Sequence, residues 1–165
     1  MRHTNPRNSS LSNKTPLHPQ KNITVYVYNP ANQLIASSSS TVNYDMTNGN
    51  FTGIADLGNN LPSGQYTIKV QSPIYLRRLI TGIQTITALQ SNNLPSAELV
   101  TGNINGDNAL NILDYNLLIG CYSDLAAAVA CDNTIKVFAD INDDGHVNQV
   151  DYNLFLREIA VQSGY

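Results

Sequence analysis

The C-terminal third of this sequence contains an internal repeat, and no other feature limits the possible folds as much. Residues 103–119 (NINGDNALNILDYNLLI) align without a gap to residues 140–156 (DINDDGHVNQVDYNLFL), at an offset of 37 positions. Eight of the seventeen aligned positions are identical. Chance rarely produces a match of this length and quality, so the repeat indicates a duplicated structural unit.

The second copy has the spacing of an EF-hand-type calcium loop. Ca²⁺ takes six to eight oxygen ligands, and a loop that curls around the ion presents them at positions 1, 3, 5, 7, 9 and 12. The expected direct ligands are the side chains of Asp140, Asn142, Asp144 and Asp151 and the main-chain carbonyl of His146, with Asn148 acting through water. Gly145 occupies position 6, where the sharp turn of such a loop often requires a positive φ.

Each loop is also expected to begin a helix. Asn148 is a favourable N-cap, and Asp151 three residues later places a negative charge at the positive end of the helix. The expected helix covers residues 149–160 with core contacts Val150, Leu154 and Ile159, and in the first copy Asn111 precedes a helix with core contacts Leu113, Leu117 and Leu118. The alternative is that both loops are only polar turns that cap helices, but the duplication of loop and helix together favours calcium.

The paired loop–helix units resemble the dockerin family, with a repeat of the type I-like kind, and the resemblance covers residues 101–162. Three features carry it: the unit is duplicated, position 12 is Asp instead of Glu, and neither loop follows an amphipathic helix. Asn103 comes directly after Thr101-Gly102, and Asp140 comes directly after Val137-Phe138-Ala139. The resemblance implies a small all-α module over residues 101–165.

The resemblance also implies a ligand set in the first copy. It consists of Asn103, Asn105, Asp107, the main-chain carbonyl of Ala109 and Asp114, with Asn111 acting through water. This loop departs from the family pattern, because Asn103 replaces Asp at position 1 and Asn108 replaces Gly at position 6. Asn tolerates positive φ, so the turn is kept, but the loop has two ligand carboxylates where the second has three. Since ligand charge tunes calcium affinity, we expect two Ca²⁺ sites, with the second site tighter.

Dockerins bind cohesin modules, so the resemblance implies a cohesin-type partner. The corresponding recognition positions are Ile112, Leu113, Ile119 and Gly120 in the first copy and Gln149, Val150, Leu156 and Arg157 in the second. The first set is apolar and the second is mixed, which favours a single binding orientation. The pair Ile112 and Leu113 could instead be internal packing.

Residues 21–100 predict an all-β domain. Ile23, Val25 and Val27 alternate with Thr and Tyr residues, which is the period-2 pattern of a strand with two unlike faces. The candidate strands are residues 23–28, 34–39, 41–46, 51–57, 65–72, 75–81, 84–89 and 97–100. Short strands separated by turn signals predict an immunoglobulin- or prealbumin-like sandwich. Residues 61–70 (LPSGQYTIKV) resemble the prealbumin-like sandwiches of the carboxypeptidase regulatory and collagen-adhesin B-repeat type, which usually act as spacers or stalks.

Residues 1–20 predict a disordered tail, because they lack periodicity and are rich in Asn, Pro and Ser. His3 and His18 lie in this segment and are expected to be solvated residues, not ligands. The segment lacks the apolar core of a signal peptide, and no stretch of the sequence approaches the roughly 18 apolar residues of a membrane span. We therefore expect a fragment, a chain without its leader, or a cytoplasmic protein.

The two cysteines, Cys121 and Cys131, have nine residues between them. This spacing suits one local disulfide, and the alternative is two free buried thiols. Between them, residues 124–130 are rich in Ala and predict a short helix. Bound calcium and cysteine pairing both favour an extracellular or cell-surface location.

The net charge and the side chains outside the calcium loops argue against two classes of function, nucleic-acid binding and catalysis. The net charge of −3 and the lack of a basic stripe argue against a nucleic-acid partner. Outside the calcium loops the sequence offers no paired carboxylates and no Ser/His/Asp set, so we expect no enzyme, although a catalytic domain could precede residue 1 in a larger bacterial protein that acts on polysaccharides. We expect an extracellular docking protein, monomeric in isolation, with the sandwich as a spacer. The alternative is a calcium-rigidified cell-surface or adhesion stalk without a cohesin partner.

Overall fold

The structure is a computed structural model that describes residues 13–124, 126, 128 and 131–161. The chain forms two compact units. The first unit contains Gln20–Ser72 and Arg77–Leu99, and the second contains residues 13–19, Pro73–Leu76 and the described residues from Val100 onward. Residues 21–100 were expected to form one continuous domain, whereas Pro73–Leu76 belong to the second unit.

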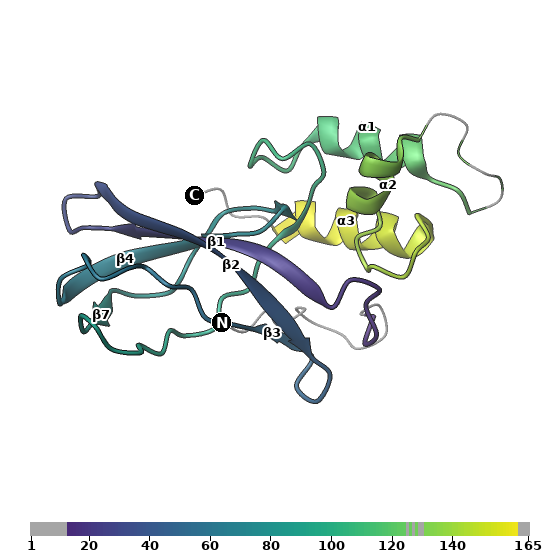
Figure 1. The fold of residues 1–165 in the computed structure, drawn as a ribbon. Coiled ribbons are helices and arrows are strands. Elements are labelled where there is room, and N and C mark those ends of the chain that lie inside the picture. Colours follow the sequence, from purple (N-terminus) through teal and green to yellow (C-terminus); the bar gives the residue numbers. More distant parts are fainter. Residues whose placement is uncertain (1–12, 125, 127, 129–130, 162–165) are drawn as a thin grey trace. The chain divides into compact units, whose positions relative to one another are not determined.

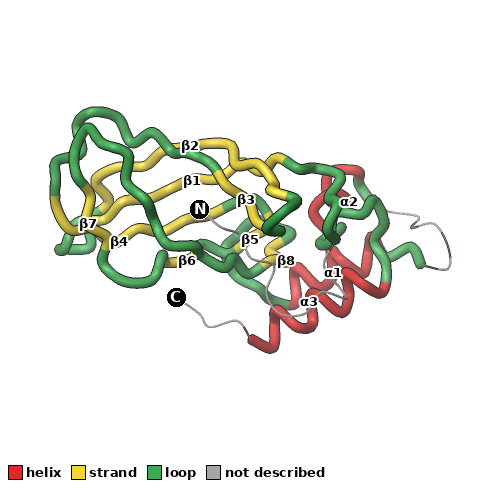
Figure 2. Tube along the Cα trace, turned by 90° about the horizontal axis from the view of Figure 1, so that it is seen from below, coloured by secondary structure: helices red, strands yellow, loops and turns green. Residues whose placement is uncertain are grey.

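The first unit is an antiparallel six-stranded sheet, and the order of its strands can be followed in Figure 2. Its strands are β1 (Gln20–Tyr28), β2 (Leu34–Asp45), β3 (Asn50–Thr52), β4 (Gly64–Gln71), β6 (Arg78–Leu79) and β7 (Gln84–Ile86). Strand β1 lies between β2 and β4, and β3 extends the sheet beyond β2. On the other side of β4, β7 pairs with its first half and β6 with its second half. This β-rich unit is consistent with the predicted sandwich class.

Alternating apolar residues give the sheet one buried face. Val27, Ile68 and Val70 are fully buried, and Ile23 and Val25 are nearly so. Side chains on the opposite face of β1 and β4 remain partly exposed, because successive residues of a strand point to opposite sides. The period-2 pattern in the sequence therefore correctly predicted both central strands.

Several predicted strand boundaries are wrong. Residues 34–39 and 41–46 were expected as two strands, but β2 runs without interruption, and Ser40 and Thr41 pair in register with β1. The consecutive serines and threonines break the hydrophobic alternation without breaking the backbone ladder. The expected strand over residues 75–81 is two short strands, and the expected strand over 97–100 is absent; β8 (Thr101–Asn103) follows it instead.

The second unit contains three described helices (Figure 1) and one two-stranded sheet (Figure 2). These elements are β5 (Ile74–Tyr75), which pairs with β8, and the helices α1 (Ile112–Cys121), α2 (Asn133–Ala139) and α3 (Gln149–Val161). The core is apolar, and its members include Leu76, Ile104, Leu118, Val147, Leu154 and Phe155. The expected helix after the second loop and the predicted core role of Leu154 are confirmed, and Val150 and Ile159 pack against the core. In α1, Leu118 is buried and Leu117 packs partly, but Leu113 is exposed, so its predicted core role is wrong.

Helix α2 corrects two expectations about the segment between the repeats. It ends directly before Asp140, so the prediction that no helix precedes the second loop is wrong. The Asp132 side chain caps the helix by accepting a hydrogen bond from the backbone N–H of Thr134 at 2.7 Å. The expected helix over residues 124–130 is not formed by its described residues, while residues 125, 127, 129 and 130 lie outside the description. The first loop follows strand β8, as the prediction required.

Two predictions about local chemistry can be compared directly with the structure. Cys121 and Cys131 form a disulfide with a Cα–Cα distance of 4.7 Å, which confirms the paired alternative. Among the described residues, no helix is long and apolar enough to cross a membrane.

Candidate metal centre

The second loop is organised around the carboxylate of Asp151, which is fully buried in the first turn of α3. Its Oδ1 accepts hydrogen bonds from the backbone N–H groups of Ile141 at 2.7 Å and Asn142 at 3.1 Å. Its Oδ2 accepts one from the backbone N–H of Asn148 at 3.0 Å. One carboxylate thus ties the start of the loop to the start of the helix.

The side chains at positions 1, 3 and 5 of this loop also turn toward its backbone. Asp140 accepts hydrogen bonds from the backbone N–H groups of Asp144 at 3.0 Å and Gly145 at 2.7 Å. The Asn142 amide donates to Asp144 Oδ2 at 2.8 Å, and Asp144 Oδ1 accepts from the backbone N–H of His146 at 2.9 Å. The four side chains predicted as direct ligands are therefore all hydrogen-bonded within the same loop.

The first loop repeats this arrangement. Asp114 is fully buried and accepts hydrogen bonds from the backbone N–H groups of Asn105 at 3.1 Å and Asn111 at 3.0 Å. The Asn105 amide donates to Asp107 Oδ2 at 2.9 Å. The buried Asn103 accepts from the backbone N–H of Asn108 at 3.1 Å, as Asp140 accepts from Gly145 in the second loop. The repeat in the sequence is thus a repeat in hydrogen-bond geometry.

Both loops turn through left-handed backbone conformations at positions 4 and 6. The φ angles at position 6 are +66° for Asn108 and +93° for Gly145, which confirms the expected turn. Position 4 was not predicted to be special, yet Gly106 has φ +77° and Asp143 has φ +59°. The glycine at position 4 of the first loop is the sequence signal that could have indicated this second turn.

The two asparagines expected to act through water have a structural role at the helix starts. Asn111 Oδ1 accepts a hydrogen bond from the backbone N–H of Leu113, and Asn148 Oδ1 accepts one from Val150, both at 2.7 Å. In α1 the reciprocal bond from the Asn111 backbone to Asp114 completes a capping box. The predicted N-cap role is confirmed for Asn111, and Asn148 makes the same pair of hydrogen bonds.

Burial disfavours the charged forms of two carboxyl groups in the second loop, those of Asp140 and Asp151. Desolvation raises the pKa of Asp151 to about 6, against the opposing hydrogen bonds from the backbone of Asn148 and Asn142. Desolvation likewise raises the pKa of Asp140, and the nearby charges of Asp144 and Asp143 add to that rise. No Lys, Arg or His of the described residues forms an ion pair with Asp140 or Asp151. A buried carboxylate without a cationic partner is unfavourable, and a divalent cation would supply the missing charge.

The donor chemistry fits calcium better than a softer metal. No group of three or more His, Cys, Asp or Glu side chains positioned for a metal occurs in the described part of the chain. A metal here would depend on amide and main-chain oxygens as well as carboxylates, and these hard oxygen donors are the ligands Ca²⁺ accepts. The residues that would hold it are the predicted ones: Asn103, Asn105, Asp107, Ala109 and Asp114 in one loop, and Asp140, Asn142, Asp144, His146 and Asp151 in the other.

The predicted recognition positions are unequal in exposure. Ile112 and Leu113 are 64% and 55% exposed, so this pair is not internal packing. Ile119, Gly120 and Gln149 are also exposed, and Leu156 is 40% exposed. In the second copy, however, Val150 packs partly against the core, and Arg157 forms an ion pair with Glu158 at 3.1 Å. Val137 on α2 is a further exposed apolar residue that sequence reasoning missed.

Residues 13–18 also contact the second loop, although they were expected to belong to a disordered tail. The Asn13 amide and the backbone N–H of Leu17 donate to the main-chain carbonyl of Asp143 at 2.8 and 3.0 Å. The His18 ring Nδ1 lies 2.5 Å from Asp143 Oδ1. These contacts join residues more than a hundred positions apart, and a polar segment without periodicity gives no sequence signal for them.

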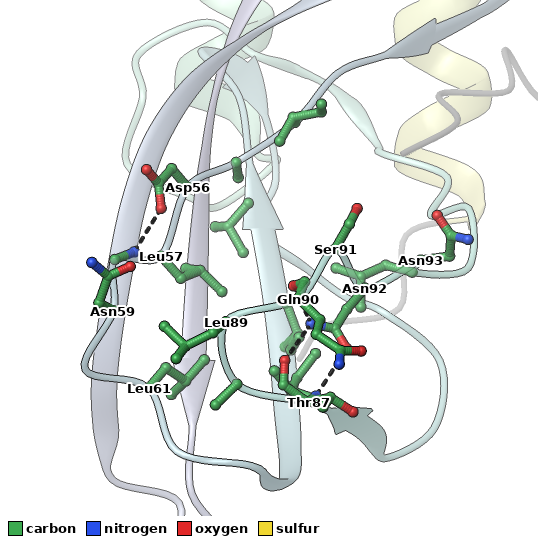
Figure 3. A pocket seen from close by; sticks show the side chains of 18 of the residues that line it. Asp56, Leu57, Asn59, Leu61, Thr87, Leu89, Gln90, Ser91, Asn92 and Asn93 are labelled. Atoms are coloured by element: carbon green, nitrogen blue, oxygen red, sulfur yellow. Dashed lines mark hydrogen bonds between the residues drawn. The ribbon is translucent and has the colours of Figure 1, made fainter.

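A second concave feature belongs to the first unit. A cavity of about 630 Å³ is lined in part by Ile23, Val25 and Ile68 of the buried face of the sheet. Figure 3 shows Leu61, Leu89 and Asn92 among its other lining residues. Asn92 at its rim accepts a hydrogen bond from the backbone N–H of Thr87 and donates to the carbonyls of Thr87 and Gln90. This amide stabilises the covering loop. We assign no ligand to the cavity.

Comparisons with known proteins identify a fold. No protein-family model and no curated protein matches the chain. It is similar to chains in two crystal structures of mutant type II cohesin–X–dockerin complexes from Acetivibrio cellulolyticus. For the C-terminal interface mutant the identity is 17%, the TM-score is 0.52, and the match covers 94% of this chain and 90% of that one. For the N-terminal interface mutant the corresponding values are 20%, 0.49, 93% and 88%.

The fold class that this likeness indicates is a β-rich fold with a helical unit, similar to that of a chain in a cohesin–X–dockerin complex. The likeness extends over most of the described chain, so it includes both the sheet and the helices.

Proposed function

We propose that this chain is a calcium-dependent docking protein of the dockerin side. Its second unit holds one Ca²⁺ in each loop and binds a cohesin-type partner, and its β-sandwich unit is a spacer. The observation that carries the proposal is the duplicated loop geometry, in which Asp114 and Asp151 make equivalent bonds to the backbone. Polar turns that only cap helices have no need to direct alternate side-chain oxygens inward at positions 1, 3 and 5.

The choice of the dockerin side is supported by the order of the units. A sheet unit precedes a unit with two loop–helix repeats, and the position-12 residue is Asp in both. Helix α2 removes one argument for this family, because the second loop does follow a helix. The duplication and the position-12 aspartates remain, and the fold likeness to a chain of a cohesin–X–dockerin complex is compatible with them.

Calcium would compensate the buried carboxylates and cross-link each loop to its helix. Asp151 already joins the first residues of its loop to the N-terminus of α3, so the ion would strengthen a connection that the hydrogen bonds outline. The proposed ligands are spread along each loop and come together only when the loop folds. Ion binding is therefore coupled to folding of the unit. The ion thereby fixes the positions of the exposed residues on α1 and α3.

The proposal places the protein outside the cell or on its surface, as a monomer in isolation and without catalytic activity of its own. The disulfide is compatible with an oxidising compartment. A longer bacterial parent protein that acts on polysaccharides would gain attachment from such a unit.

Calcium titration tests the proposal. We expect the far-UV circular dichroism of the helices to decrease in a chelator and to recover on addition of Ca²⁺. A recombinant type II cohesin should bind the full chain in Ca²⁺ and not in the chelator. A spectrum indifferent to calcium contradicts the calcium sites. Calcium binding without cohesin binding favours the alternative, a calcium-rigidified surface stalk.

A further inference from the structure

The N-terminal strap, which we define as residues 13–18, is attached to one residue of the second loop. Asp143 accepts four hydrogen bonds or ion-pair contacts from it. Two reach the main-chain carbonyl, from the Asn13 amide and the backbone N–H of Leu17. Two reach the carboxylate, from the backbone N–H of His18 at 3.0 Å and from the His18 ring at 2.5 Å. The strap and this loop belong to the same compact unit.

Asp143 has a left-handed backbone conformation. It stands at position 4 with φ +59°, which is uncommon for residues other than glycine and is adopted by Asp and Asn more often than by most. The Leu17 side chain covers the other left-handed position, because its Cδ1 lies 3.1 Å from where a Cβ on Gly145 would be. The strap therefore fixes both residues that flank Asp144, the position-5 ligand.

Position 4 of the first loop has no side chain that could form an equivalent attachment. It is Gly106, and open space surrounds the place that a Cβ would occupy. Position 6 of that loop, Asn108, adopts the same left-handed conformation as Gly145. The two loops thus share their internal hydrogen bonds and differ at position 4.

We propose that the N-terminal strap is a positioning element of the second calcium site. This inference rests on the proposed function, since it concerns the calcium affinity of one of its two loops. By stabilising the left-handed conformations of Asp143 and Gly145, the strap lowers the free-energy cost of ordering the loop, and this ordering is coupled to ion binding. The folded form of the second loop is therefore stabilised by a segment outside the repeat, and Asn13 and His18 act through Asp143, not as ligands.

Calcium titration of the full chain, followed by NMR at constant neutral pH, separates the two loops. The backbone amide signals of Gly145 and Gly106 report the second and first loop respectively. We expect the double variant Asn13→Ala, His18→Ala to weaken calcium binding at the second loop about tenfold, because both side-chain hydrogen bonds to Asp143 are lost. The first loop should change less than about twofold, since neither side chain is hydrogen-bonded to it.

Matched variants keep the test specific. Lys14→Ala removes an exposed residue whose side chain forms no hydrogen bond or ion pair with Asp143, and it should leave both affinities unchanged. His18→Gln keeps a donor for the Asp143 carboxylate, so it should retain more of the affinity than His18→Ala. A general loss of stability would weaken calcium binding at both loops, and His18→Gln would then bind no more tightly than His18→Ala.

The outcomes separate the inference from the proposed function. Unchanged affinity at the second loop in the double variant, or an equal loss at both loops, overturns the inference while calcium binding stands. If Ca²⁺ shifts neither amide signal in the natural chain, the proposed function fails and the inference fails with it. Hydrogen exchange of the Leu17 and His18 amides then shows whether the strap itself is docked.

Discussion

Asp114 and Asp151 are equivalent residues in two loops, and each is fully buried where its helix begins. Each accepts a hydrogen bond from the backbone N–H at position 3 of its loop and another from the N-cap residue, at distances of 3.0 or 3.1 Å. A carboxylate in this place is both a connector of loop and helix and the expected position-12 ligand. Its removal should therefore abolish one site and leave the other.

The first prediction concerns the order of the two affinities. In Asp114→Ala the second loop remains intact, with three ligand carboxylates. In Asp151→Ala the first loop remains intact, with two. We expect the site that remains in Asp114→Ala to bind Ca²⁺ about 10–100-fold more tightly, since one charge-assisted contact contributes about 1.5–3 kcal/mol. Isothermal titration of both variants measures the two constants, and the reverse order would contradict the charge argument.

The second prediction concerns a close approach of backbone and core at Gly102. A Cβ there would lie 3.0 Å from Phe155 Cδ2 and 3.1 Å from Leu110 Cδ1, and φ is +97°. Gly102→Ala should therefore lower the free energy of unfolding by about 2–4 kcal/mol, from the left-handed backbone and the overpacking together.

Gly106→Ala is the matched control for this prediction. Gly106 also has a positive φ but has open space around it, so only the backbone contribution of about 1–2 kcal/mol remains. Urea unfolding in saturating Ca²⁺, followed by circular dichroism of the helices, measures both variants. Equal losses would show that the contact with Phe155 is not tight.

The loops could be predicted from sequence because calcium ligation is a local pattern. Alternate oxygen-bearing residues and a glycine or asparagine at position 6 specify the turn within a dozen residues. Asp143 and its attachment could not be predicted in this way, since its partners Asn13 and His18 are distant in sequence.

The same difference between local patterns and distant partners explains which parts of the fold could be predicted. The alternation in β1 and β4 is a strong local signal, whereas the pairing of β5 with β8 joins a short segment to a distant one. The sequence does contain a signal for helix α2. Ile135, Phe138 and Ala139 have the i, i+3, i+4 spacing of a core-facing helical stripe. Ala139 belongs to the core, and Ile135 and Phe138 pack against it. The helix is short, and its last residues Val137-Phe138-Ala139 suit a strand equally well.

The third prediction concerns the disulfide. Cys121–Cys131 closes a short loop between α1 and α2, so its loss should lower the free energy of unfolding by about 2–3 kcal/mol. Urea unfolding of the chain in a reductant that cleaves the bond measures this directly. The double variant Cys121→Ala, Cys131→Ala should lose more than the reduced chain, because Cys121 is buried and its truncation leaves a cavity. A reduced chain as stable as the oxidised one would count against a stapling role.

The last prediction concerns the recognition surface and its single orientation. Ile112→Ala with Leu113→Ala should weaken binding of a type II cohesin by at least about thirtyfold, because exposed apolar residues at the centre of an interface contribute about 1–2 kcal/mol each. Gln149→Ala with Leu156→Ala should change the affinity less than about threefold, because only the first copy presents an apolar pair. Met46 in the first unit is 73% exposed, and Met46→Ala is the control for a general loss of apolar surface. All three variants should unfold as the natural chain does, since the side chains involved are exposed. Equal losses in the two double variants would instead indicate that both copies are used, in two related orientations.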